Sequence, residues 1–525
     1  MTNINHKILL GAAITLASLQ QASAVPFAPA DARAMGMGGT GVSSAEIAST
    51  VQFNPALLAT TRDDDHFGLK IPQFSLTVAD DDGFIDEAED FDEESDLDAS
   101  NQDRTNVELL ENLLDETVNT SGQGLQLLET ALDKIDAGNY ISGRTDLNNA
   151  FTQIDGRLFD SSGGTPELSL FSNAIADDLD DINNKALRIN GGLNIAAAIP
   201  SKKFAMAVYA GGQVTFSGKV NVSEKDSALL RNYSDATSEY LKLVNDLRVA
   251  LNTNDFAAAD SAEDAIRLFD YGLGDGEGGT AIFEDGELVA SDANLDSEIV
   301  MVGVAVADVG LTISRMFNIK GHDISFGITP KLQKVSIFDY KHQLDGKDEN
   351  GNDVEFDADD FDENQEDYSG FNIDLGAAYQ FGDTKQWQTG IVIKNLIGDD
   401  YESKFYKDTN GVEGTVVTIN PMVRAGISHR TSWTKVAFDL DITENDPVGF
   451  EDATQYAAIG GELNVWRIVQ LRAGYRANLA GSDQDIMTAG IGLSPGAVHL
   501  DIGVMANTSD IENEAGIALE FGVEF

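Results

Sequence analysis

Six histidines are the residues best suited to acid–base catalysis or metal binding. They are His6, His66, His322, His342, His429 and His499. No two are spaced as zinc ligands usually are, and none has an obvious serine and aspartate partner. The chain has no cysteine, which excludes disulfides, thiol catalysis and thiolate metal sites. It also lacks the phosphate-binding loop G-x-x-x-x-G-K-[ST] and the nucleophile elbow G-x-S-x-G. The sequence therefore predicts no bound cofactor and no enzyme, such as a lipid hydrolase.

Acidic residues dominate the charge of the chain. Its 88 Asp and Glu against 34 Lys and Arg give a net charge of −54. A nucleic-acid partner requires the opposite sign and is excluded. Residues 80–98 alone carry twelve acidic side chains, and residues 339–367 are similar. Such loops could bind divalent cations near lipid head groups. Simple solvation is the alternative, and it is the interpretation we prefer.

The first 24 residues have the pattern of a secretory signal peptide. Lys7 precedes an apolar run from Ile8 to Leu19, and Ala22-Ser23-Ala24 forms a small-x-small cleavage site. The run is too short for a membrane anchor, which needs roughly 20 residues. We expect cleavage near Ala24 and export of residues 25–525.

After residue 65, apolar and polar residues alternate with period two in segments of roughly ten residues, which is typical of transmembrane β-barrels. In the last segment Ile517, Leu519, Phe521, Val523 and Phe525 share one face. The pattern predicts fourteen antiparallel strands, at 67–79, 188–200, 203–219, 297–317, 322–341, 367–381, 386–398, 415–428, 432–443, 454–465, 467–478, 485–493, 497–507 and 513–525. The expected fold is an all-β barrel over residues 66–525 in the outer membrane of a Gram-negative bacterium.

The connectors between these strands alternate in length. In each adjacent pair the odd-numbered connector is the longer, which fits long outer loops and short periplasmic turns. Connectors 80–187 and 220–296 contain leucines at helical spacing. We expect two helical insertions forming a cap outside the membrane. They could bind a partner, but packing against each other is the simpler expectation.

The mature N-terminus resembles a known family. It reads Asp-Ala-Arg-Ala-Met-Gly-Met-Gly-Gly-Thr-Gly-Val at 31–42, followed by Asn54-Pro55-Ala56. The order of these elements resembles the opening of the FadL-type outer-membrane transporters. The length, helical insertions and acidic loops look most like the conjugal-transfer TraF-like outer-membrane proteins. The thioredoxin-like TraF of conjugative plasmids is a different protein, and the lack of cysteine separates the two.

The resemblance implies an N-terminal hatch at 25–65 inside the barrel. The gate residues would be Gly36, Gly38, Gly39, Gly41, Asn54 and Pro55. A packed glycine turn without a ligand role is the alternative for the glycines. The family also passes cargo through a break near the third strand, where Gly211 and Gly212 could support a kink. Glycine pairs also occur at 191–192 and 460–461, so this lateral opening is one hypothesis.

The C-terminal residues Phe521, Val523 and Phe525 look like the signal by which the barrel assembly machinery recognises its clients. That machinery and outer-membrane lipid are therefore expected partners. Aromatic residues near strand ends fit girdles at the lipid interface, while inward charges of both signs fit ion-pair networks in a wet lumen.

Two functions follow from these expectations. The first is a channel or transporter for hydrophobic or amphiphilic small molecules. The second is a structural or interaction protein, conjugation-associated in the family's name, that acts through its acidic outer loops. The sequence names no cargo.

Overall fold

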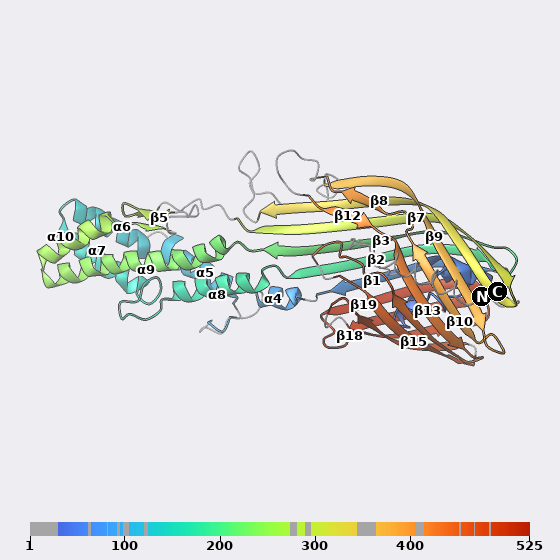
Figure 1. The fold of residues 1–525 in the computed structure, drawn as a ribbon. Helices are drawn as coiled ribbons and strands as arrows, with labels where there is room; N and C mark the ends of the chain where they lie inside the picture. The colour runs from blue at the N-terminus through green and yellow to red at the C-terminus, as the bar shows by residue number, and fades with distance from the viewer. Residues whose placement is uncertain are drawn as a thin grey trace, which may run out of the picture.

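A computed structural model describes residues 30–60, 65–80, 82–91, 95–97, 104–119, 124–272, 281–288, 296–343, 364–404, 414–450, 453–466, 468–481 and 485–525. The predicted signal peptide lies outside these residues, as do positions 344–363 of the second acidic loop. The described part of the chain forms a barrel with a long helical extension at one end (Figure 1).

The barrel closes through fourteen antiparallel strands in the described residues. In chain order they are β1 (Gly68–Ala79), β2 (Ala186–Ile199), β3 (Ala205–Asn221), β7 (Glu298–Ile319), β8 (His322–Gln343), β9 (Gln365–Phe381), β10 (Trp387–Lys394), β13 (Met422–Arg430), β14 (Thr434–Asp441), β15 (Tyr456–Val465), β16 (Val469–Asn478), β17 (Ile486–Leu493), β18 (Val498–Asn507) and β19 (Glu514–Glu524). Each strand pairs with its neighbour along the chain, and β19 pairs with β1. The predicted strand number and order are confirmed, and the positions agree approximately, except that the first part of the strand predicted at 415–428 forms the separate strand β12 (Val416–Ile419).

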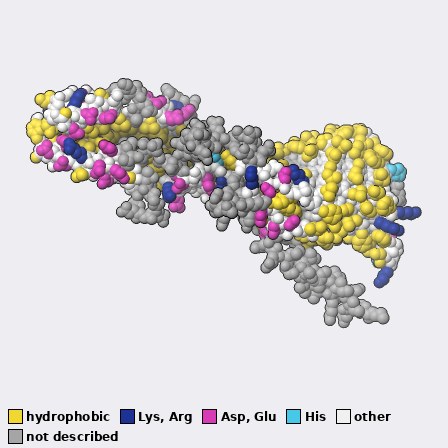
Figure 2. Space-filling model, turned by 90° about the horizontal axis from the view of Figure 1, so that it is seen from above, with side chains coloured by type: hydrophobic (Ala, Val, Ile, Leu, Met, Phe, Trp, Pro, Cys, Tyr) yellow, Lys and Arg dark blue, Asp and Glu magenta, His cyan; other side chains and the backbone are white. Residues whose placement is uncertain are grey.

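Alternation of side chains explains why these segments form a membrane barrel. Each strand turns large apolar residues outward, and one example from each in the order above is Phe74, Leu193, Val208, Val309, Leu332, Phe371, Ile391, Ile427, Phe438, Ile459, Leu471, Met487, Ile502 and Leu519, all exposed. Figure 2 shows the apolar belt on one face of the barrel. Closure satisfies the backbone hydrogen bonds, so such a belt can face lipid. The alternate residues face the lumen.

The wall is taller on one side. Strands β7 and β8 have 22 residues each, whereas β13 to β18 have 8 to 10. The hairpin of β11 (Asp399–Glu402) and β12 (Val416–Ile419) packs on the inner face of the tall side. Tyr401, Val417 and Ile419 bury Val304 and Ile337 there. This apolar contact stabilises the parts of β7 and β8 that extend beyond the lipid-facing belt.

The helical extension is built from both predicted insertions. Its elements are α4 (Phe84–Asp90), α5 (Asn106–Leu114), the π-helical turn η3 (Asp115–Asn119), α6 (Gly124–Asp136), α7 (Tyr140–Ile154), α8 (Glu167–Ile182), α9 (Glu224–Thr253) and α10 (Phe256–Arg267). A small sheet of β4 (Tyr271–Gly272), β5 (Ala281–Glu284) and β6 (Glu287–Leu288) follows.

The two insertions share one hydrophobic core. Leu113 and Leu147 from the first insertion pack in the same cluster as Leu247 and Leu251 from the second. The expected mutual packing is therefore confirmed. The helices nevertheless extend away from the barrel instead of capping its mouth (Figure 1). The 30-residue helix α9 would be about 45 Å long, which makes a projecting bundle a natural outcome.

Within the described residues, none of the helices has the length and apolar composition needed to cross a membrane.

Candidate functional site

The N-terminal segment 30–60 lies inside the barrel. It folds into short turns, α2 (Ala32–Met35), η1 (Ile47–Ser49), α3 (Thr50–Phe53) and η2 (Pro55–Ala59). Asp31 caps α2 by accepting from the Ala34 amide at 2.7 Å, and Asn54 caps η2 by accepting from Ala56 at 3.0 Å. Such side-chain caps satisfy amides that a short helix leaves free. We call this segment the hatch.

Two polar side chains connect the hatch to the wall near its centre. The Asp439 carboxylate on β14 accepts from the backbone N–H groups of Gly41 and Val42 at 2.7 and 2.9 Å. The Asn54 amide donates to the carbonyl of Val42 at 3.0 Å and to that of Ala377 on β9 at 3.2 Å. Both side chains are buried. Hydrogen bonds to a charged acceptor are stronger than neutral ones, so Asp439 is the principal hydrogen-bonded anchor at this point.

Ion pairs hold the hatch at the end of the barrel where the short turns lie. Arg33 donates to Glu462 on β15 at 2.7 Å, and Glu46 pairs with Lys435 on β14. Arg472 on β16 also donates to Glu462 at 2.9 Å. The sequence predicted that inward charges such as Lys435 and Arg472 pair within the lumen, and the structure confirms it.

Glycines on the wall give the hatch backbone room. At several wall positions an added Cβ would press against the hatch, among them Gly327, Gly376, Gly390, Gly460, Gly474, Gly490 and Gly503. Several face each other across neighbouring strands, including Gly460 with Gly474 and Gly490 with Gly503. At these glycines the contacts are with hatch backbone or with Asn54 and Pro55, so the hatch fits directly against the sheet.

Five of the six predicted gate residues lie at this contact, and Gly39 lines a cavity beside it. Gly36 meets Gly490, and Gly38 donates to Thr488 Oγ1 at 2.9 Å. Gly38 and Gly39 have φ of +71° and +83°, a backbone region that favours glycine. The remaining predicted residues are Gly41, which packs against the ring of Phe53, and Asn54 and Pro55, which lie against Gly376. The structure thus places all six residues in the hatch and five of them at the hatch–wall contact. A gating role for them stays a prediction.

The lateral opening expected at Gly211 and Gly212 is absent from the described wall. Strand β3 pairs without interruption with β2 from Met206 to Lys219 and with β7 from Ala205 to Asn221. A glycine has no side chain to pack, but it still forms its backbone hydrogen bonds. At Gly211 the missing side chain leaves room for a neighbour, because an added Cβ would collide with the side chain of Asn194. The prediction of a break at this pair is therefore wrong for this structure. Among the paired barrel strands, β1 has a bulge between Lys70 and Gln73 instead.

The C-terminal residues complete the closure of the barrel. Phe525 accepts from the amides of His66 and Phe67 and donates back to Phe67, at 2.7, 2.7 and 3.0 Å. Phe521 and Phe525 are 46% and 61% exposed and so remain available to lipid or a partner, while Val523 pairs with Leu69 and Val498. Recognition by the assembly machinery stays a prediction.

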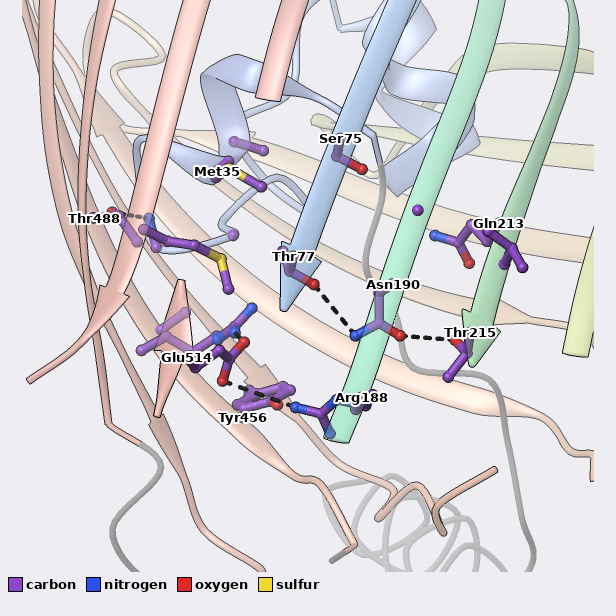
Figure 3. A pocket seen from close by; sticks show the side chains of 18 of the residues that line it. Met35, Ser75, Thr77, Arg188, Asn190, Gln213, Thr215, Tyr456, Thr488 and Glu514 are labelled. Atoms are coloured by element: carbon purple, nitrogen blue, oxygen red, sulfur yellow. Dashed lines mark hydrogen bonds and ion pairs between the residues drawn. The ribbon is translucent and has the colours of Figure 1, made fainter. Parts of the chain in front are cut away.

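Two cavities flank the hatch. The outer chamber has a volume of about 80 Å³ and lies between the hatch and strands β1 to β3 on one side and β15 to β19 on the other. Its polar lining includes Thr77, Asn190, Thr215, Arg188 and Glu514, and Met35 contributes an apolar surface (Figure 3). The second cavity, which we call the vestibule, has a volume of about 410 Å³, is lined by Arg33, Glu46, Lys435 and Glu462, and reaches the turn at Thr431. The hatch is the structure that separates these spaces.

Metal binding finds no support in the described residues. No group of three or more histidine or carboxylate side chains there is close enough to hold an ion. The acidic positions 344–363 lie outside the described residues, so a divalent-cation role for them stays a prediction.

Sequence reasoning missed the wall glycines and the outer chamber. The glycines carry a weak signal, because Gly460, Gly474, Gly490 and Gly503 occupy the inward position of successive period-two strands. Arg188 and Glu514 are more than 300 residues apart, at the outer ends of β2 and β19, and nothing local connects them.

A family comparison identifies the chain. The family model described as "F plasmid transfer operon, TraF, protein" matches residues 51–441, about three quarters of the sequence. The chain belongs to this family. No curated protein matches this TraF-family chain.

Several solved barrels are similar to this TraF-family member at very low identity. The toluene transporter TbuX of Ralstonia pickettii has 9% identity and a TM-score of 0.42, with 94% of this chain and 98% of that chain covered. A Pseudomonas aeruginosa FadL homologue has 11% identity and a TM-score of 0.39, with coverages of 96% and 99%. The P. putida toluene transporter TodX has 10% and 0.35, with 95% and 98%. At this identity and TM-score, these structures carry no argument about function or cargo.

Proposed function

We propose that this chain is an outer-membrane channel of a Gram-negative bacterium that takes up small amphiphilic molecules, with residues 30–60 as its gate. The proposal depends on one observation. A segment held by specific polar contacts separates the outer chamber from the vestibule within one lumen. A purely structural anchor has no need for a cavity on each side of its plug.

The bonding of the hatch favours a gate over a permanent seal. The Asp439 carboxylate, the Asn54 amide and the pairs Arg33–Glu462 and Glu46–Lys435 are polar contacts that water can replace. In the outer chamber, Met35 and Met505 lie among polar residues. This mixed lining suits an amphiphile better than a pure hydrocarbon.

The test is uptake into liposomes that contain the full-length mature protein. Three four-carbon solutes of matched size serve as probes: 3-hydroxybutyrate, 1,3-butanediol and 4-amino-2-butanol. Entry of any of them faster than into protein-free liposomes supports transport. If all three enter no faster than into protein-free liposomes, with the barrel shown to be folded and inserted, the transport function is contradicted.

A second candidate function is interaction through the helical extension. Ile141, Phe256 and Leu268 are 76%, 57% and 72% exposed on α7 and at the two ends of α10. Exposed apolar side chains of this size are common at protein–protein contacts. The interaction function replaces transport if two results are obtained together. No probe crosses the membrane, and cells in which these three residues are replaced by serine lose a property that wild-type cells have.

A further inference from the structure

One arginine of the barrel wall points toward the lipid. The buried side chain of Ser314 on β7 donates to the carbonyl of Ala56 in the hatch at 3.3 Å, so it faces the lumen. Side chains alternate along a strand, which turns the next residue, Arg315, outward, where it is exposed. Phe317, two residues further on the same face, is 43% exposed. Arg315 therefore lies on the outward face of β7, which is otherwise apolar near this end.

Aromatic side chains surround this charge. The guanidinium of Arg315 lies 5.2 Å from the centre of the Phe317 ring. On β8, Phe326 pairs directly with Arg315 and is 46% exposed. On the other side, the register between β3 and β7 brings Phe204, which is 56% exposed, next to Arg315. Exposed aromatic rings near the strand ends of a membrane barrel mark the level of the lipid head groups.

Arg315 has no ionic partner of its own in the described part of the chain. No carboxylate there forms an ion pair with it, and the ring of Phe317 carries no net charge. A charged side chain on the lipid face is costly in the middle of the bilayer but tolerated where it reaches the head groups. Lipid phosphate is the anion present at that level, and a planar guanidinium can bind it through two N–H groups.

Two lysines add positive charge at the same end of the barrel. Lys203 lies in the turn between β2 and β3, and Lys320 lies in the turn between β7 and β8. Both are exposed, and each is next to an exposed apolar residue. The carbonyl of Lys202 accepts from the amide of Met316 at 2.9 Å, which holds the first turn against β7. The turn that carries Lys203 is therefore fixed beside the strand that carries the outward arginine.

Basic side chains outnumber acidic ones on this surface. The segments 200–204, 315–323 and 382–386 carry five Lys or Arg and two Asp. One of these carboxylates, Asp323, accepts a hydrogen bond from Lys385 at 2.5 Å. The excess of positive charge contrasts with the net charge of −54 for the chain. Figure 2 shows Lys and Arg side chains at this end of the barrel, opposite the helical extension.

We propose that this surface binds the head group of an anionic phospholipid. Arg315 contacts the phosphate, Lys203 and Lys320 lie beside it, and the acyl chains follow the outward rings of Phe317 and Phe326. The excess positive charge favours a head group of net negative charge over a zwitterionic one. The site lies on the outer surface of the wall, so it goes beyond the proposed function and does not depend on the hatch or on transport.

Native mass spectrometry of the full-length mature protein in detergent measures this binding. The probes are phosphatidylglycerol and phosphatidylcholine with identical acyl chains, which differ in the net charge of the head group. Each basic residue near a lipid surface favours an anionic lipid about fivefold, so we expect the first phosphatidylglycerol to bind about fivefold more tightly or better. Equal affinities for the two lipids overturn the proposal.

Two matched variants test the assignment to Arg315. Arg315→Gln should reduce the preference for phosphatidylglycerol about fivefold. Arg144→Gln makes the same change on α7 of the helical extension and should bind both lipids as the wild type does. An Arg315→Gln variant with the wild-type preference overturns the assignment. If that variant does not fold, Lys203→Gln in its exposed turn decides, because an unchanged preference there overturns the proposal as well.

Excess glycerol phosphate separates a lipid site from a site for soluble anions. Because the phosphate position adjoins exposed aromatic rings, the acyl chains should contribute to binding, and phosphatidylglycerol should stay bound. Complete displacement by glycerol phosphate would overturn the lipid site. The uptake experiment has no bearing on this result, so failure of transport and failure of lipid binding are distinguishable.

Discussion

At the scale of single residues, the position of the hatch depends both on hydrogen-bonding side chains of the wall and on wall glycines that have no side chain. Asp439 supplies an acceptor for two hatch amides, while Gly460 and Gly474 leave space for the backbone at Met37 and Gly38. Backbone packed this closely tolerates no added methyl group without a shift, because protein interiors are close-packed. The fit of the hatch is therefore sensitive to small changes in the wall.

Gly460→Ala tests this fit. The new methyl group would collide with the carbonyl of Met37, so we expect the docked hatch to lose about 1–3 kcal/mol. Cleavage by trypsin after Arg33, which is buried in the docked hatch, should increase and can be measured by mass spectrometry. The neighbouring Gly461→Ala is the control, since its Cβ comes no closer than 3.9 Å to another atom. Equal cleavage in both variants would show that the wall glycines do not position the hatch.

The sequence predicts the hatch residues but not their counterparts on the wall. Gly36 to Gly41 and Asn54-Pro55 form a local motif, so order along the chain identifies them. Gly460 matters only because Met37 lies against it, and that proximity joins positions more than 400 residues apart. The error at Gly211 and Gly212 has the same origin. A glycine pair is compatible with a kink or with space for a neighbour, and only the position of Asn194 decides between them.

At the scale of elements, strands were easier to predict than the orientation of the helices. Lipid outside and polar groups inside impose period two on each strand, as in Leu519, Phe521 and Val523 of β19. Leucines at helical spacing likewise predict α5, α6 and α9. The sequence of α9 alone does not predict that the helix projects from the barrel, because its orientation depends on its contacts with α7, α8 and α10.

Leu247→Ala tests whether the extension is a separate folding element. Leu247 of α9 is fully buried in the core shared by both insertions, so its truncation should cost about 2–5 kcal/mol. We expect the helical transition in circular dichroism to move to lower temperature while the strand signal is retained. Val249→Ala, at a 47% exposed position of the same helix, should have little effect. Simultaneous loss of both signals in Leu247→Ala would show one cooperative unit.

Deletion of Phe525 tests the end of β19. The residue closes the barrel through its backbone bonds with Phe67 and presents an exposed ring, so its removal should lower the amount of protein inserted in the outer membrane. Quantifying the protein in membrane fractions measures this. Phe525→Tyr keeps both features and should insert normally. Wild-type levels for the deletion would exclude an assembly role.

At the scale of the whole molecule, an acidic helical bundle stands on a barrel whose lumen is divided by its own N-terminal segment (Figures 1 and 2). The bundle and the barrel can each serve a function. The central claim concerns the barrel, where the hatch lies between the outer chamber and the vestibule. If the hatch is a gate, its state must control passage through the lumen.

Single-channel conductance of the protein in planar bilayers tests that claim most directly. Asp439→Ala removes the acceptor for Gly41 and Val42, whereas Asp485→Ala removes a carboxylate that bonds Tyr475 outside the lumen. We expect the wild type and Asp485→Ala to stay closed for most of the recording and Asp439→Ala to open repeatedly. A wild type that conducts continuously, or an inserted Asp439→Ala that stays as closed as the wild type, would contradict the account of the hatch as a gate.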